Sequence, residues 1–319
     1  MRLIGWKGRV STMNIKIEDL NKSYGKKQAL SGVSLTIEQG MFGLLGRNGA
    51  GKTTLMKVLA SLLAPNSGKV TVCDVPLSHA SEIRKMTGYL PQEFSMYPNM
   101  TVYEAMDYLG VLSGIEKSER KKRIPILLKK VNLEQKTKTK VKSLSGGMKR
   151  RLGIAQAILH DPKVLIVDEP TAGLDPEVRV RFRNLLCEIA QERIVILSTH
   201  IIGDIEATCE NIAILDTGKL IYNGTVTALV EQVEGKVYSL EVEKKDLAAL
   251  KTKYLITGTL ALGNHVNVRL ISEEKPSSKA EASKASVEDA YMYLMHHFAG
   301  YNLETIESAC SFGRERGED

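Results

Sequence analysis

A glycine-rich run, GRNGAGKT from Gly46 to Thr53, constrains this chain more than any other stretch. It fits the spacing G-x-x-x-x-G-K-[ST] and lies between a predicted strand (41–45) and a predicted helix (53–63). Gly46, Gly49 and Gly51 are expected to take φ values that are closed to other residues, so consecutive N–H groups can curl around phosphate oxygens. The positive end of the following helix favours the same anion. We expect Lys52 to reach the β- and γ-phosphates and the Thr53 hydroxyl to bind Mg²⁺, so the chain is predicted to bind a nucleoside triphosphate.

Composition sets the broad class of the protein. The chain has 319 residues, enough for two domains, and a mild net charge of +7. Its four cysteines lie far apart without a C-x-x-C pair, which predicts a reducing compartment and no metal cluster. No apolar run approaches the roughly 20 residues that cross a bilayer. We therefore expect a protein that neither spans a membrane nor is secreted. Residues 1–12 are interpreted either as a disordered extension or as a mis-called start before Met13.

Two predicted strands end in polar side chains that suit phosphate chemistry. KVLIVDEP (163–170) is typical of a strand buried in a parallel sheet, and it ends in Asp168 and Glu169. Such sheets bind ligands at the carboxyl ends of their strands. There, one carboxylate can hold Mg²⁺ through water and the other can take a proton from an attacking water. A second strand pattern (193–200) ends in His200, which we expect to contact the γ-phosphate.

Two other features indicate ligand contacts. Ser145, Gly146 and Gly147 open a predicted helix that ends before Pro162, and this makes a second anion site of exposed N–H groups. Tyr24 lies in a predicted turn ahead of the phosphate loop. It can stack on a purine base or, as turn tyrosines commonly do, pack against its own sheet.

The region between residues 116 and 151 is strongly basic, and it follows a helix predicted to begin with a capping box at Thr101 and Glu104. Three interpretations of the basic region remain open. It is a solvated helical face, a surface held near anionic lipid head groups, or a nucleic-acid surface. The third is disfavoured because the region has few aromatic residues to stack on bases.

The pattern changes after residue 235. Alternating strands are predicted at 236–243 and 265–271, with a helix at 244–251 and a hairpin turn at Gly263 and Asn264. Residues 272–286 have the composition of a flexible linker. A last helix is expected after Ser286, stopped by Gly300. Its predicted apolar face consists of Val287, Ala290, Tyr291, Leu294 and Phe298.

With these motifs in this order, residues 14–235 resemble the nucleotide-binding subunit of an ATP-binding cassette (ABC) transporter. The resemblance implies an α/β P-loop ATPase core with a helical subdomain at about 93–158, followed by a small α+β accessory domain at 236–319. That last segment resembles the C-terminal extension of bacterial two-component exporter ATPases. Arg47 stands where the family often has proline, and Met148 where it often has glutamine. We interpret both as subfamily variation.

The resemblance also implies a role for each matching residue. The nucleotide is held by the adenine-stacking Tyr24 and by the Walker A loop, which comprises Gly46, Arg47, Asn48, Gly49, Ala50, Gly51, Lys52, Thr53 and Thr54. The metal-sensing Q-loop residue is Gln92, the Walker B carboxylate is Asp168, the catalytic base is Glu169, the D-loop residue is Asp175 and the switch histidine is His200. The family signature, which acts on the nucleotide of the second copy, comprises Leu144, Ser145, Gly146, Gly147 and Met148.

In function, the resemblance implies an ATPase with ATP and Mg²⁺ that powers a separate transmembrane permease, in the export direction. Two copies would close head to tail around ATP, peripherally bound at the cytoplasmic face of the membrane, with no nucleic acid involved. The rival is a soluble cassette ATPase that acts on DNA or ribosomes. Such DNA-repair members carry a long coiled-coil insertion and the ribosomal ones carry two cassettes, and neither feature is present here.

Overall fold

A computed structural model describes residues 13–171 and 174–298. The chain divides into two compact units, and the boundary along the sequence falls between Asn223 and Gly224. The sequence pattern places this boundary after residue 235. The difference arises because α8 (Val226–Glu231) packs against α10 (Val287–Phe298) within the second unit. The predicted extension at 1–12, the helix stop at Gly300 and the tail lie outside the described residues.

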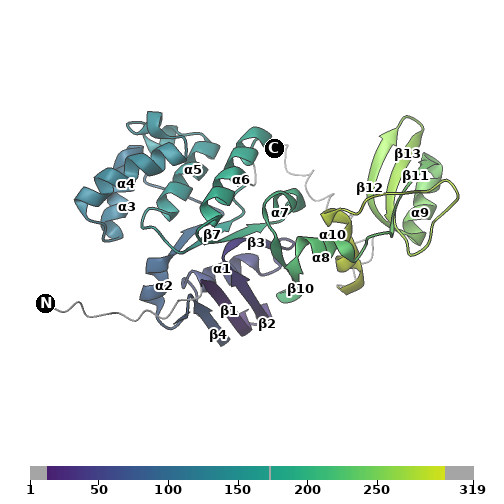
Figure 1. Cartoon of the computed structure of the whole chain (residues 1–319), viewed down its shortest axis with the longest axis horizontal. Helices are drawn as coiled ribbons and strands as arrows, with labels where there is room; N and C mark the ends of the chain where they lie inside the picture. The colour runs from purple at the N-terminus through teal and green to yellow at the C-terminus, as the bar shows by residue number, and fades with distance from the viewer. Residues whose placement is uncertain (1–12, 172–173, 299–319) are drawn as a thin grey trace. The chain divides into compact units, whose positions relative to one another are not determined.

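The first unit contains two sheets (Figure 1). The antiparallel sheet has the order β2-β1-β4-β5, with β1 (Asn14–Tyr24), β2 (Lys27–Glu38), β4 (Ser67–Val72) and β5 (Val75–Pro76). The second sheet has the order β10-β9-β3-β8-β7-β6, with β3 (Gly40–Leu45), β6 (Thr87–Leu90), β7 (Val164–Asp168), β8 (Ile194–Thr199), β9 (Asn211–Asp216) and β10 (Lys219–Thr225).

The parallel strands of the second sheet bring the predicted motifs to one edge. Every residue of β7 and β8 is buried, as the continuous apolar runs predict. In the register, Leu45 of β3 pairs with Thr199 of β8, and Asp168 of β7 pairs with Ser198 of β8. The carboxyl ends of the three strands therefore lie side by side, and the loops that leave them share one site.

Helices complete the first unit. α1 (Lys52–Leu59) contributes Leu55, Met56, Val58 and Leu59 to a buried core shared with both sheets. α3 (Val102–Leu112), α4 (Lys117–Lys130) and α5 (Gly146–Ala157) group together (Figure 1). The capping box predicted for α3 is present, since Thr101 N–H donates to the Glu104 carboxylate at 2.8 Å and Glu104 N–H donates to Thr101 Oγ1 at 3.2 Å. The other helices are α2 (Ala80–Met86), α6 (Pro176–Ala190) and α7 (Ile202–Thr208), with 3₁₀ turns at Glu134–Lys136 and Val141–Ser143.

The second unit is a four-stranded antiparallel sheet with helices, as its predicted α+β character requires. Its order is β12-β13-β11-β14, with β11 (Val237–Glu243), β12 (Leu255–Leu262), β13 (His265–Ile271) and β14 (Glu281–Ala282). The remaining helices are α9 (Leu247–Lys253) and a 3₁₀ turn at Lys244–Asp246. The predicted hairpin turn at Gly263 and Asn264 joins β12 to β13, although the sequence pattern did not indicate β12 itself.

Two predictions for this unit are wrong. Residues 272–286 are not simply a linker, because β14 pairs with β11 and Ala280 and Ala285 are buried. Phe298 is not on the buried face of α10, because 68% of it is exposed. The helix cap is confirmed, since Ser286 Oγ accepts a hydrogen bond from Asp289 N–H at 3.2 Å.

Within the described ranges, none of the helices combines the length and apolar character needed to cross a bilayer. Three of the cysteines, Cys73, Cys187 and Cys209, are free thiols. Burial raises the pKa of the Cys209 thiol to about 12, so it is protonated and unreactive near neutral pH.

Candidate active site

The loop between β3 and α1 has the geometry that the glycine spacing predicts, with one difference. Gly49 and Gly51 have φ angles of 84° and 106°, which other residues rarely adopt. Gly46 is not in this left-handed region. It is required for space, because a Cβ there would lie 2.4 Å from the carbonyl oxygen of Leu215 on β9. The expectation that all three glycines supply positive φ is therefore wrong for Gly46.

A cavity of about 330 Å³ gathers many of the predicted nucleotide ligands. It is lined by Tyr24, Lys27, Ala29, Arg47, Asn48, Gly49, Ala50, Gly51, Lys52, Thr53, Thr54, Gln92 and Glu169. Half of Tyr24 is exposed, and the Lys22 ammonium lies 5.7 Å from the centre of its ring. The predicted turn residue Tyr24 is instead the last residue of β1, and its half-exposed side chain lines the cavity.

Lys52 lines this cavity with only 5% of its surface exposed. Its ammonium donates to the carbonyl oxygens of Gly46 at 2.6 Å and Arg47 at 3.2 Å. It also pairs with Glu169 Oε1 at 3.4 Å. A buried ammonium held by a loop and a single carboxylate can offer its charge to a phosphate with small movements of the side chain.

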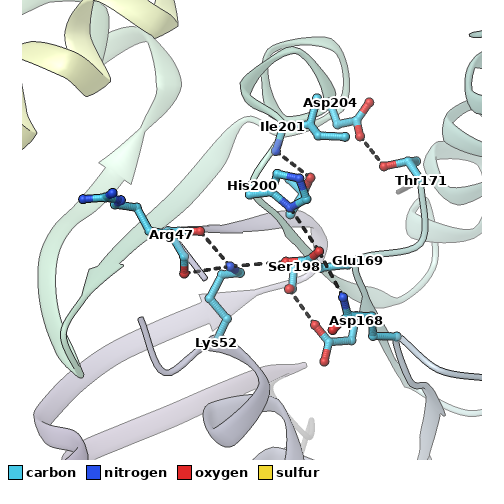
Figure 2. Close-up of polar contacts among 12 residues, drawn as sticks. Arg47, Lys52, Asp168, Glu169, Thr171, Ser198, His200, Ile201 and Asp204 are labelled. Carbon is cyan, nitrogen blue, oxygen red and sulfur yellow. Dashed lines mark hydrogen bonds and ion pairs between the residues drawn. The ribbon is translucent and has the colours of Figure 1, made fainter. Parts of the chain in front are cut away.

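Glu169 is the centre of the polar contacts at the site (Figure 2). Besides Lys52, its carboxylate contacts His200 Nδ1 at 3.0 Å and accepts a hydrogen bond from Gln92 Nε2 at 3.4 Å. Its backbone has a φ of 45°, a strained conformation for a residue with a side chain, and its N–H donates to the Ser198 carbonyl at 3.0 Å. The structure therefore brings the predicted base, the switch histidine and the Q-loop glutamine into direct contact.

Asp168 is fully buried directly before Glu169. One carboxylate oxygen accepts a hydrogen bond from Ser198 Oγ at 2.8 Å, whereas Oδ2 is buried without a hydrogen-bond partner among the described residues. An unsatisfied buried carboxylate oxygen is costly unless a ligand completes it. Burial, and then the charge of Asp168, raises the pKa of the nearby Tyr89 hydroxyl to about 12, so Tyr89 is neutral near pH 7.

These groups suit Mg²⁺. The ion prefers oxygen ligands in an octahedron, keeps several waters and takes few protein ligands beside substrate phosphates. The free oxygen of Asp168 and the hydroxyl of Thr53 are ligands of that kind. In the described part of the chain, no cluster of three or more His, Cys, Asp or Glu side chains is placed to hold a metal.

The signature residues and Asp175 are not among the residues that line this cavity. Ser145 caps α5 by accepting a hydrogen bond from Met148 N–H at 3.3 Å, and a Cβ at Gly146 would meet no neighbour within 4 Å. Asp175 is exposed at the start of α6, where its side chain makes no capping hydrogen bond. The start of α5 is therefore open and exposed to solvent at Ser145 and Gly146.

Sequence reasoning assigned no role to three buried polar residues near the site, Thr171, Ser198 and Asp204. Ser198 holds Asp168, and Asp204 on α7 accepts hydrogen bonds from Thr171 and from Arg183 on α6. The signal in the sequence was a carboxylate four residues after His200, in a segment that also carries Glu206. A lone aspartate is common on surfaces, so its burial could not be inferred.

The family model for ABC transporter proteins matches residues 30–172. The chain is 33% identical over 297 residues to the uncharacterized ABC transporter ATP-binding protein YxlF of Bacillus subtilis, with 88% of this chain and 99% of the relative covered. It is 38% identical over 248 residues to the Nod factor export ATP-binding protein I of Ralstonia nicotianae, with 76% of each chain covered.

A solved structure gives the same result for the fold. The dimeric ABC transporter cassette MJ0796 superposes with a TM-score of 0.61 at 26% identity, and the match covers 66% of this chain and 98% of the cassette. The α/β P-loop ATPase fold predicted from the sequence is thereby confirmed. The chain belongs to the ABC transporter family, as an ATP-binding and ATP-hydrolysing subunit that powers a separate transmembrane permease.

Proposed function

We propose that this chain hydrolyses ATP with Glu169 as general base and couples the reaction to export. The observation that carries the proposal is the position of the Glu169 carboxylate. It is buried at the edge of the phosphate-loop cavity, within 3.4 Å of Lys52 and Gln92 and 3.0 Å of His200. A carboxylate held by three side chains beside a phosphate site is placed to orient and deprotonate a water.

In the proposed reaction, the oxygen of a water attacks the γ-phosphorus of ATP, and the bond between that phosphorus and the β–γ bridging oxygen breaks to release ADP. The water's proton moves to Glu169, whose Oε2 is oriented by His200. Lys52 exchanges its loop carbonyls for the β- and γ-phosphates as ATP enters. Thr53, Asp168 and Gln92 would hold Mg²⁺, which would supply positive charge beside the phosphates. Tyr24 stacks on the adenine.

The start of α5, exposed at Ser145 and Gly146 and expected from the sequence to bind an anion, supports a head-to-tail arrangement of two copies. Leu144–Met148 do not line their own chain's cavity, and Ser145 and Gly146 are exposed, so the start of α5 is available to a nucleotide held by another copy. The N–H groups at the start of α5 and the Ser145 hydroxyl favour the γ-phosphate of that nucleotide. Asp175, exposed at the start of α6, would lie in the same interface.

A second cavity supports docking of the permease beside Gln92. It measures about 650 Å³ and is lined by Tyr89, Pro91, Glu93, Phe94, Ser95, Met96, Tyr97, Pro98, Leu109 and Gln156. Tyr97, one of the lining residues, forms an edge-to-face pair with Tyr108, with 5.0 Å between ring centres and each ring about two-fifths exposed. An apolar groove with exposed aromatic side chains suits a short apolar segment of a partner. Movement of Gln92 would then connect this groove to Glu169.

The chain is proposed to work at the cytoplasmic face of the membrane, where its permease lies. Export is favoured because the Ralstonia nicotianae relative is a Nod factor export protein. The rival function on DNA or ribosomes is not favoured, since both of these sequence relatives are transporter ATP-binding proteins.

Glu169→Gln tests the head-to-tail site. The substitution keeps the side-chain shape and removes its basicity, so hydrolysis should fall by a factor of about 10²–10⁴ while ATP still binds. The variant should elute as a dimer on size exclusion only with ATP. Adding Ser145→Arg places a bulky side chain where the γ-phosphate must dock, and the dimer should disappear. Glu177→Gln, at an exposed position on α6, is the matched control. A Glu169→Gln chain that stays monomeric in saturating ATP, or that hydrolyses ATP normally, would contradict the proposal.

A further inference from the structure

Asp204 is a buried carboxylate outside the predicted machinery. It lies on α7, four residues after His200, and none of its surface is exposed. The Thr171 hydroxyl donates to its Oδ2, and the Arg183 guanidinium donates to its Oδ1 at 3.3 Å (Figure 2 shows the Thr171 contact). A buried charge persists when each oxygen is satisfied, and breaking such a set leaves an unpaired charge behind.

The partners of Asp204 come from the segments that carry the site. Thr171 lies two residues after Glu169, in the segment that leaves β7. Arg183 lies on α6, which begins directly after Asp175. Asp204 itself lies on the helix that follows His200. One side chain therefore fixes the segments that bear the base, the D-loop residue and the switch histidine.

The contact between Glu169 and His200 requires that the segment leaving β7, which carries Glu169, and the segment leaving β8, which carries His200, keep their relative position. Near the sheet they are joined by Ser198, whose Oγ donates to Asp168 and whose carbonyl accepts the Glu169 N–H. Beyond Glu169, the described residues join the two segments again where Thr171 meets Asp204. A strained residue such as Glu169, at φ 45°, keeps its conformation only when the surrounding structure over-determines it.

We propose that Asp204 is a positioning residue for hydrolysis: through Thr171 and Arg183 it holds the Glu169 and His200 segments at the separation that the Glu169–His200 contact requires. The inference rests on the proposed function in assigning Glu169 and His200 to the reaction. It predicts that loosening the Thr171–Asp204 contact lowers turnover without weakening ATP binding, since neither residue lines the nucleotide cavity.

Thr171→Val is the sharpest variant. Asp204→Asn faces Arg183 with a neutral amide inside the protein, so it can disturb folding, whereas valine keeps the volume of threonine and leaves the Asp204–Arg183 ion pair in place. The full-length chain should lose roughly tenfold to hundredfold in kcat for ATP, because small misplacements at a reaction centre have effects of this size. KM should stay within about twofold. Thr171→Ser, which keeps the hydroxyl, should restore kcat. Arg181→Met removes an exposed ion pair on α6, the helix that carries Arg183, and should leave kcat unchanged.

A double-mutant cycle separates positioning from a general structural defect. Single-turnover hydrolysis is measured for Thr171→Val in the native chain and in a His200→Ala chain. If Asp204 acts through the Glu169–His200 contact, Thr171→Val should cost less than about twofold once His200 is absent. An equal loss in both backgrounds, or failure of Thr171→Ser to restore kcat, overturns the inference and leaves the assignment of Glu169 intact. Normal hydrolysis by both Glu169→Gln and His200→Ala overturns the proposed function and this inference with it.

Discussion

Each unit of this protein contains a buried aspartate in contact with a hydroxyl group, and the two carboxylates differ in how completely they are satisfied. Asp168 of the first unit is fully buried, yet its Oδ2 has no hydrogen-bond partner in the described structure. Asp289 of the second unit is 1% exposed and is held by Arg269, Thr257 and Ser286 at 2.5–3.1 Å. A buried carboxylate oxygen without a partner can bind a ligand, whereas a carboxylate with all its hydrogen bonds made stabilises the fold.

The cations follow the same division. Lys52 donates to two loop carbonyls and shares Glu169 with His200 and Gln92, so its charge is available to phosphates. Arg269 donates hydrogen bonds from Nε and a terminal nitrogen to the two oxygens of Asp289. It also donates to the Lys284 carbonyl. That fork-to-fork geometry is strong and specific, and it leaves little capacity for a ligand. The nucleotide site of the first unit therefore leaves groups available to a ligand, whereas the groups around Asp289 in the second unit satisfy one another.

The largest expected effect is that of Lys52→Ala on ATP turnover. Without the ammonium, the β- and γ-phosphates lose a buried positive charge, and Glu169 loses its ion-pair partner. ATP binding and hydrolysis should fall together, to background in a phosphate-release assay. Hydrolysis at the native rate would show that this loop does not hold the triphosphate. Lys27→Ala, on the rim of the same cavity, is the matched control and should retain most activity.

The second prediction concerns the stability of the accessory unit. Asp289→Ala removes the common partner of Arg269, Thr257 and Ser286, and breaking a buried ion pair costs about 3–5 kcal/mol of unfolding free energy. The second unit should unfold at lower urea in tryptic-protection or hydrogen-exchange measurements. ATP hydrolysis should stay within about twofold of native, because the nucleotide cavity is lined entirely by the first unit. Arg269→Met should give a loss of similar size. A large loss of turnover with an intact second unit would contradict this separation of roles.

The same carboxylate predicts how stability depends on pH. Burial raises the pKa of Asp289, but hydrogen bonds from Arg269, Ser286 and Thr257 outweigh burial and hold that pKa below its ordinary value. The stabilisation is therefore fully present above the ordinary aspartate pKa of about 3.9, and it is lost as the pH falls through the lower folded pKa. Acid unfolding of the second unit should show this loss in the native chain. Asp289→Ala should flatten it.

The sequence predicted most of the first unit because its motifs are local. The Gly46–Thr53 spacing, the run ending at Asp168 and the cap at Ser145 each specify backbone geometry within a few residues. It did not predict the contacts of Asp204 or Ser198, because these depend on which strands become neighbours. The second unit was less predictable for a similar reason. β12 contains Gly258 and β14 has only two residues, so both are set by pairing rather than by their own patterns.

A third prediction tests whether the rim of the cavity contributes binding energy. Tyr24 is half exposed, so its ring offers a face to the adenine base. Loss of base stacking typically costs about 1–3 kcal/mol, so Tyr24→Ala should raise the dissociation constant for ATP by roughly 5- to 150-fold. Tyr24→Trp should bind normally, because indole also stacks. Isothermal titration with the full-length chain measures both. Equal affinities for all three chains would make Tyr24 a packing residue, like the buried residues of the second unit.

The smallest expected effect concerns exposed cations, and it extends the comparison to the surface. In the second unit, Lys236 pairs with Glu273 and Lys245 pairs with Glu243. On α4 of the first unit, Lys117, Lys121, Lys122 and Lys129 are exposed and form no ion pair among the described residues, and Ile126 between them is 66% exposed. Unmatched lysines beside an exposed apolar side chain suit an anionic membrane surface, where each basic residue contributes about 1 kcal/mol.

The full-length chain should therefore sediment with phosphatidylserine-containing vesicles, should not sediment with neutral vesicles, and should be released by moderate salt, which screens exposed charges. Lys122→Gln should lower the partition coefficient by about fivefold, the equivalent of 1 kcal/mol. Lys245→Gln removes the same charge from a side chain that already has a partner, so it should change little. Equal losses in the two variants would mean that net charge alone governs binding. Binding to both vesicle types or to neither would show that α4 is a solvated face. Release of the chain from vesicles by added RNA would favour a nucleic-acid surface.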